Sequence, residues 1–156
     1  MALKSNFNEA RSMRDIEKQA EVIYTKILNS YIRAGEQFVI NARGQLQSHA
    51  MGQYHDQTTN LRNSIGYFVF YNGTLVRNDN KIAIPRAKID HLINPRGFQL
   101  IGIAGMNYAS HVESKGYNVI SYQADIAVID LALYLEKINV VGGGTAAGLE
   151  ETFIPD

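Results

Sequence analysis

Histidine and carboxylate side chains are the groups in this chain with the greatest capacity for catalysis or metal binding. Two of the four histidines stand close to acids: His55 precedes Asp56, and His111 lies two residues before Glu113. Neither pair belongs to an HExxH motif or to another recognised spacing of metal ligands. We therefore expect hydrogen-bonded or solvated histidines and no metal site. A hydrolase that uses His55 stays an alternative, and loss of its activity in His55→Ala would support it.

Paired acids, nucleotide-binding loops and reactive cysteines are the other kinds of site considered, and the sequence lacks the residues or the spacing for each. Asp125 and Asp130 lie five residues apart, a spacing that does not place two side chains on one helix face. Gly102, Gly105 and the glycines at 142–144 lack the GxGxxG spacing and the Lys-Ser/Thr pair of nucleotide-binding loops. The chain has no cysteine, which excludes disulfides, thiolate ligands and a cysteine nucleophile. We expect no catalytic residue, no cofactor and no enzymatic activity.

Composition favours one globular domain with a neutral surface. The chain has 156 residues, of which 46% are hydrophobic. Its 15 basic and 15 acidic residues give a net charge of zero, whereas a general duplex-DNA binder carries a basic excess. The charged segment at 1–18 has no apolar core, so we expect no signal peptide. The most apolar segment, IAVIDLALYL, is shorter than the roughly 20 residues that span a bilayer, so we expect no membrane partner.

A long amphipathic helix is predicted over residues 15–48. Apolar residues recur there at steps of three and four, the spacing of one helix face. They are Ile16, Ala20, Ile23, Ile27, Tyr31, Ala34, Phe38, Ala42 and Leu46. Such a helix is about 50 Å long, more than a core of this size can cover, so we expect part of it to overhang and to pack on something else. Gly35 and Gly44 weaken it, and a kink or an end near Gly44 is an alternative to an unbroken helix.

A small, mostly antiparallel sheet is predicted to follow. Asn72-Gly73 suits a type I′ hairpin turn between a strand at 65–71 and a return strand that starts at Leu75. Further strands are expected at 82–84, 98–104 and 117–122, with an irregular excursion over 85–97.

A second helix is predicted over residues 124–138, apolar on more than one side and therefore in need of cover on several faces. The expected fold class is α+β, with an N-terminal and a C-terminal helix packed on the small sheet. We expect a loose arm over 1–14, a single domain over 15–138 and a flexible tail over 139–156.

Two segments carry a resemblance to a known family. Residues 55–70, HDQTTNLRNSIGYFVF, resemble a signature of head–tail joining and tail-completion proteins of tailed bacteriophages, which reads roughly Asp-Arg-Thr-Gly-Asn-Leu-Arg-x-Ser-Ile. The signature leads from the first helix into the first strand. Gln57 and Thr59 depart from the commoner Arg and Gly. The matching residues are Asp56, Thr58, Asn60, Leu61, Arg62, Ser64 and Ile65.

The second segment resembles the family's strand followed by Tyr-Ala-x-x-Val-Glu-x-Gly. Residues 101–104 supply the strand, and one extra residue precedes the glycine. The matching residues are Tyr108, Ala109, Val112, Glu113 and Gly116. Read physically, Leu61 and Ile65 anchor the first segment in the core, and Arg62 is placed to pair with Glu113 or with backbone carbonyls.

The resemblance implies a structural virion protein without a catalytic role. Members of the family form rings in the phage neck, between the portal or adaptor and the tail, with DNA only passing through the channel. It implies assembly in the host cytoplasm and subunit contacts through the long helix and the hairpin region. Abundant tyrosine suggests interface anchors, and our candidates are Tyr31, Phe38 and Tyr134.

Two alternatives to a neck connector remain. A tail terminator or another ring protein of the same virion differs only in its position. A small nucleic-acid-binding module would use the basic segment 77–96 and would bind with a strong salt dependence, although a solvated loop is the simpler explanation of that segment.

Overall fold

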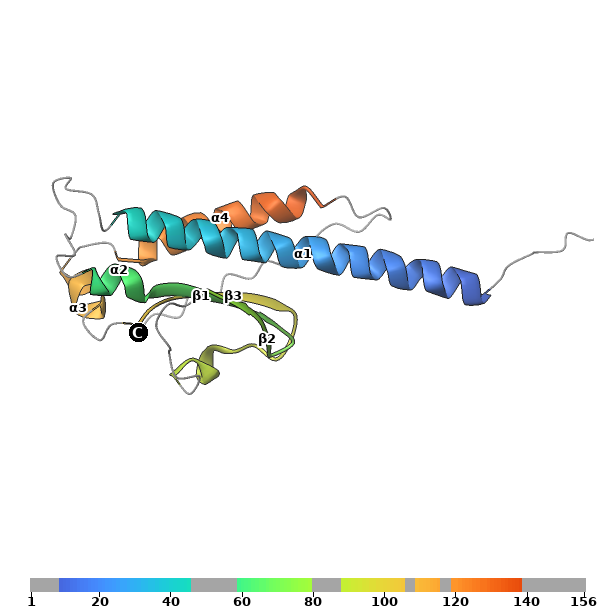
Figure 1. Cartoon of the computed structure of the whole chain (residues 1–156), viewed down its shortest axis with the longest axis horizontal. Helices are drawn as coiled ribbons and strands as arrows, with labels where there is room; N and C mark the ends of the chain where they lie inside the picture. The colour runs from blue at the N-terminus through green and yellow to red at the C-terminus, as the bar shows by residue number, and fades with distance from the viewer. Residues whose placement is uncertain (1–8, 46–58, 80–87, 106–108, 116–118, 139–156) are drawn as a thin grey trace, which may run out of the picture.

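The computed structural model describes residues 9–45, 59–79, 88–105, 109–115 and 119–138 (Figure 1). The long helix α1 lies on one face of a three-stranded antiparallel sheet with the strand order β2-β1-β3, and a second helix, α4, packs against α1. The expected α+β arrangement is therefore confirmed. The strand expected at 82–84 and the tail expected over 139–156 lie outside the described residues.

Helix α1 runs over Glu9–Gln45, and its 37 residues correspond to about 55 Å. It begins earlier than expected, so residues 9–14 are not part of a loose arm. Their sequence, EARSMR, contains good helix formers that extend the helix without needing an apolar partner. Gly44 lies inside the helix, and the end expected near residue 48 falls outside the described residues.

The sheet is built around β1 (Ile65–Tyr71), which pairs with β2 (Thr74–Asn78) and β3 (Phe98–Ala104). Asn72 and Gly73 both have positive φ, 50° and 75°, which confirms the predicted type I′ turn. The register of β2 shifts by one residue opposite Val69 and Phe70, so this edge strand carries a bulge.

Both faces of β1 are covered, which explains its uninterrupted apolar sequence. Ile65, Tyr67 and Val69 belong to a cluster shared with the helices. Phe68 and Phe70 point to the opposite face, where they join a second cluster with Ile89, Ile101 and others. Ile89 directly precedes the short 3₁₀ helix η2 (Asp90–Leu92), so part of the excursion expected over 85–97 closes this second face.

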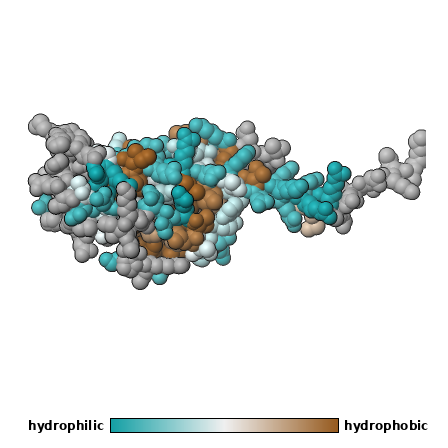
Figure 2. Space-filling model, in the orientation of Figure 1, coloured by the Kyte–Doolittle hydropathy of each residue, from teal (hydrophilic) through white to brown (hydrophobic). Residues whose placement is uncertain are grey.

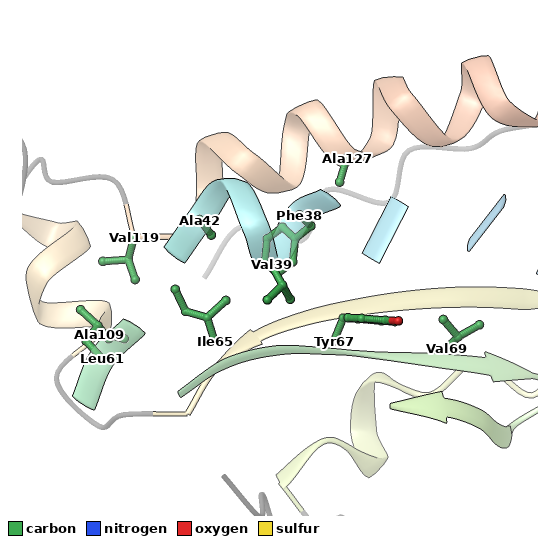
Figure 3. Close-up of a cluster of buried hydrophobic side chains, with 10 residues drawn as sticks. All are labelled: Phe38, Val39, Ala42, Leu61, Ile65, Tyr67, Val69, Ala109, Val119 and Ala127. Atoms are coloured by element: carbon green, nitrogen blue, oxygen red, sulfur yellow. The ribbon is translucent and has the colours of Figure 1, made fainter. Parts of the chain in front are cut away.

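Two glycines let α1 approach the sheet closely. A Cβ atom on Gly35 of α1 would lie 2.7 Å from Cγ of Tyr67, and a Cβ on Gly102 of β3 would lie 2.7 Å from Cζ of Phe38. Tyr67 and Gly102 are register partners, so the two rings and the two glycines interlock across one interface. Figure 3 shows Phe38 and Tyr67 between α1 and the sheet. The sequence suggested only that Gly35 weakens the helix; its role in packing comes from the structure.

Helix α4 (Ser121–Glu136) runs antiparallel to α1. Near its start, Gln123 Nε2 donates a hydrogen bond to Oε1 of Gln45 at 3.1 Å. Near its end, the guanidinium of Arg33 lies 4.6 Å from the ring centre of Tyr134. The strand expected at 117–122 is wrong from residue 119 on: Ala124 N donates to the carbonyl of Ile120 in the first helical turn, and buried Val119 joins the core at the entry to the helix.

Candidate functional site

The first signature forms a turn that enters the sheet. Thr59 adopts a left-handed backbone conformation (φ 60°, ψ 1°), and its carbonyl accepts a hydrogen bond from Asn63 N at 2.9 Å. The short helix α2 (Asn60–Ser64) follows and passes directly into β1. Leu61 and Ile65 are both 0% exposed, which confirms that they anchor this segment. Asp56 and Thr58 lie outside the described residues.

The structure brings the second segment onto the first. Gly105 N, just after β3, donates a hydrogen bond to the carbonyl of Ser64 at 3.1 Å. Ala109, the first residue of α3 (Ala109–Ser114), is buried in the same cluster as Leu61 (Figure 3). The two signatures, some 40 residues apart in the sequence, therefore form one structural unit at one end of the sheet.

Part of the second signature falls outside this description. Tyr108 and Gly116 lie outside the described residues, as do the side chains of Val112 and Glu113. The pairing of Arg62 with Glu113 therefore stays a prediction.

Arg43 is a structural residue of this region that sequence reasoning did not single out. Its Nη2 donates a hydrogen bond to the carbonyl of Ile65 at 2.7 Å and so ties the last turn of α1 to the start of β1. Its buried Nε has no hydrogen-bond partner in the part of the chain that the structure describes. A basic residue in the last turn of a helix usually complements the helix dipole, and nothing in the sequence indicated a contact 22 residues away.

The three aromatic residues predicted at subunit contacts pack within their own chain. Phe38 is only 3% exposed and lies in the core, so its assignment to an interface is wrong. Tyr31 is half-buried, and its hydroxyl donates a long, 3.5 Å hydrogen bond to the carbonyl of Phe98. Tyr134 is half-buried beside Arg33. The reason is that the apolar stripe of α1 faces this chain's own sheet and α4 over residues 31–42.

Other apolar residues are exposed instead. On α1, Met13 and Ile16 are 63% and 64% exposed. They belong to the first turns of the helix, residues 9–23, which project past the rest of the described body (Figure 1) and which we call the α1 overhang. Figure 2 shows this overhang as a mostly hydrophilic rod that leaves the body. The expectation that part of the helix extends beyond its core is confirmed.

Helix α4 exposes a second apolar surface. Tyr122, Ile129 and Leu133 are exposed, and half-buried Ile126 lies between them on the same side of the helix. We call these four residues the α4 outer stripe. Another side of α4, with Gln123 and Ala127, is buried, and Gln123 contacts Gln45 of α1.

A cluster of aromatic side chains lies where α1 extends past the sheet. Tyr24 of α1 packs edge-on against Tyr71 at 4.9 Å between ring centres and lies 5.2 Å from Phe98. Tyr31, two turns further along, lies 5.3 Å from Phe98. These contacts hold the helix against the end of the sheet, so the overhang continues a firmly seated helix.

Among the described residues, half-buried Tyr31 and buried Tyr67 have clearly perturbed pKa values. Burial raises the pKa of Tyr31. Burial also raises the pKa of Tyr67, and the nearby Arg77 guanidinium opposes this rise. The Tyr67 hydroxyl is buried and has no hydrogen-bond partner among the described residues.

Metal-ligating side chains do not gather in the described ranges. These ranges hold no cluster of three or more histidine, aspartate or glutamate side chains that could bind a metal ion. His91 is exposed on η2, whereas His49, His55 and the side chain of His111 lie outside the description. Of the basic segment 77–96, Arg77, Lys88 and Arg96 are exposed, and residues 80–87 are not described. Among the described helices, none combines the length and the apolar character of a membrane span.

No protein-family model, curated protein or solved structure matches this chain.

Proposed function

We propose that this chain is a structural subunit of a tailed-phage virion that forms a ring in the neck, between the portal and the tail. In this role it joins head to tail or completes the tail, and it has no catalytic function. The ring leaves a channel through which DNA passes, and the neighbouring portal or adaptor and tail proteins are its partners. A tail terminator of the same virion shares the same construction and differs in its place in the particle.

The observation that carries this proposal is the meeting of the two signature segments. Gly105 bonds to Ser64, and Ala109 packs in the cluster of Leu61, so the segments that resemble the family are halves of one unit. The backbone of Thr59 adds support. The family's commoner residue at this position is glycine, and Thr59 takes the left-handed conformation that glycine adopts most easily.

The exposed surfaces also suit a subunit that assembles. A seated helix with a projecting end offers a rigid arm to a neighbour, and the exposed apolar residues of α1 and α4 are candidates for contact. The zero net charge removes long-range repulsion between copies.

Deleting the gene and examining the resulting particles tests the proposal. In the deletion we expect filled heads and tails that fail to join, or tails that are not completed correctly. Mass spectrometry of wild-type particles should detect several copies of the chain. Joined, infectious particles that lack the polypeptide would contradict the proposal. A neck connector and a tail terminator are distinguished by whether the chain remains with isolated heads or with isolated tails.

A further inference from the structure

Two apolar stripes are exposed along most of their length in the described part of this chain, with Ile23 and Ile126 half-buried, and the stripes match in spacing. On the α1 overhang, Met13, Ile16, Ala20 and Ile23 follow one another at steps of three, four and three residues. In the α4 outer stripe, Tyr122, Ile126, Ile129 and Leu133 follow at steps of four, three and four. Alternating steps of three and four are the pattern by which two helices pack side by side at a shallow angle.

The overhang stripe has the same character as the core. It continues along α1 into Ala34, Phe38 and Ala42, which are buried against this chain's own sheet and α4. Ile16 lies on the same face, yet it is 64% exposed because the sheet and α4 end before reaching it. The overhang therefore exposes the same apolar face that α1 buries further along its length.

The two stripes also agree in length. At 1.5 Å per residue, Met13 to Ile23 spans about 15 Å and Tyr122 to Leu133 spans about 16 Å. One stripe can cover the other along its whole length. Small Ala20 gives room for a large residue such as Tyr122 or Ile129 on the opposing helix.

The two stripes of one molecule cannot meet each other. Helix α1 is continuous from Glu9 to Gln45, and α4 lies beside its far end, since Gln123 contacts Gln45 and Tyr134 contacts Arg33. From Arg33 to Ile16 is 17 residues of continuous helix, about 25 Å. Only a second molecule can bring an α4 outer stripe to the overhang.

We propose that the α1 overhang of one copy packs against the α4 outer stripe of the next copy, as the repeating contact between subunits. The contact joins two different patches, so every added copy leaves one stripe free at each end until a ring closes. This inference deepens the proposed ring and rests on it for closure, but the contact itself is tested on the isolated protein.

The test uses the full-length chain in sedimentation velocity over a wide range of concentration. Ile16→Asp places a charge in the overhang stripe, and Ile129→Asp places one in the outer stripe. Each is expected to weaken association by about 30-fold or more, because a buried, unpaired carboxylate costs more than 2 kcal/mol, which corresponds to that factor. Lys18→Asp is the matched control: its side chain is exposed on the opposite face of the overhang, and assembly should persist.

Mixing the two variants gives the sharpest outcome. The Ile16→Asp copy keeps an intact outer stripe and the Ile129→Asp copy keeps an intact overhang, so the mixture should form a 1:1 dimer and nothing larger. Because the chain has no cysteine, Ile16→Cys mixed with Ile129→Cys should also give disulfide-linked heterodimers under oxidising conditions, in excess over either homodimer. This second measurement does not depend on the stability of the aspartate variants.

Three results would overturn the contact. The wild-type chain could remain monomeric at every concentration while Ile16→Asp lowers its resistance to urea. Those two results together would mean that the chain covers its own overhang. The Ile129→Asp variant could self-associate as well as wild type, which would indicate pairing between two overhangs. Assembly could survive both aspartate substitutions. None of these results bears on whether the chain is present in particles, so a failure of this contact and a failure of the proposed function are distinguishable.

Discussion

Replacing Gly35 by alanine tests how closely α1 sits on the sheet. Alanine favours an exposed helix interior by about 1 kcal/mol over glycine. At residue 35 the new methyl group would lie 2.7 Å from Cγ of Tyr67, whereas carbon atoms in contact are separated by about 3.5–4.0 Å. Helix and ring must therefore separate by about 1 Å. Tyr67 is fully buried on the central strand, so this separation also loosens its neighbours.

The expected magnitude follows from these two opposing effects. Overpacking of this kind typically costs about 1–3 kcal/mol, and a rigid helix over a central strand places the cost near the upper end. After the gain in helix propensity, Gly35→Ala should lower the free energy of unfolding by about 1–2 kcal/mol. Gly44→Ala is the matched control, because a Cβ there meets nothing within 4 Å. It should raise the free energy of unfolding by about 1 kcal/mol.

Urea unfolding followed by circular dichroism, at one fixed protein concentration, measures the difference. With a slope of about 2 kcal/mol per molar urea, the midpoints of the two variants should lie at least about 1 M apart. A Tyr67→Leu background should shrink the cost of Gly35→Ala, because the ring that it meets is gone. Equal stabilisation by both alanine substitutions would refute the close packing of α1 on β1.

Three further predictions concern the first signature and the buried tyrosine. Thr59→Gly should raise the free energy of unfolding by about 1 kcal/mol, because glycine adopts φ 60° without the cost that a side chain pays; an unchanged thermal midpoint would count against the left-handed turn. Arg43→Met keeps the apolar stem but removes the donor to Ile65, so chemical unfolding should show a loss of about 1–2 kcal/mol, and wild-type stability would argue that this bond contributes nothing. Tyr67 has a raised pKa in the folded state, so its stability contribution is complete below about pH 10 and declines as the pH rises further, when the unfolded chain ionises first. Tyr67→Phe should therefore reduce the loss of stability between pH 9 and about pH 11, measured as the shift of the urea midpoint, and an identical loss in both proteins would disprove this role.

Local sequence signals predicted the elements whose geometry is set locally. Asn72-Gly73 specifies a type I′ turn because both residues accept positive φ, and the apolar run of β1 indicates a strand covered on both faces. The long helix followed from one apolar stripe. Its start at Glu9 was missed because residues 9–14 have good helix propensity but little of the periodicity used to define the helix.

Features that depend on tertiary packing were not predictable in the same way. The run around Val119 has the β-branched composition of a strand, but short apolar runs do not distinguish a strand from the entry to a buried helix. Similarly, a stripe along α1 shows which residues share a face without showing where the core ends. That is why Phe38 was assigned to an interface and is buried, while Met13 and Ile16 on the same face are exposed.

A reconstruction of the neck of particles assembled from the genome that encodes this chain tests its proposed role most directly. We expect a ring of identical subunits between portal and tail, each with a helix of about 55 Å beside a three-stranded antiparallel sheet. A fully interpreted neck in which every subunit is traced to other polypeptides would contradict the account.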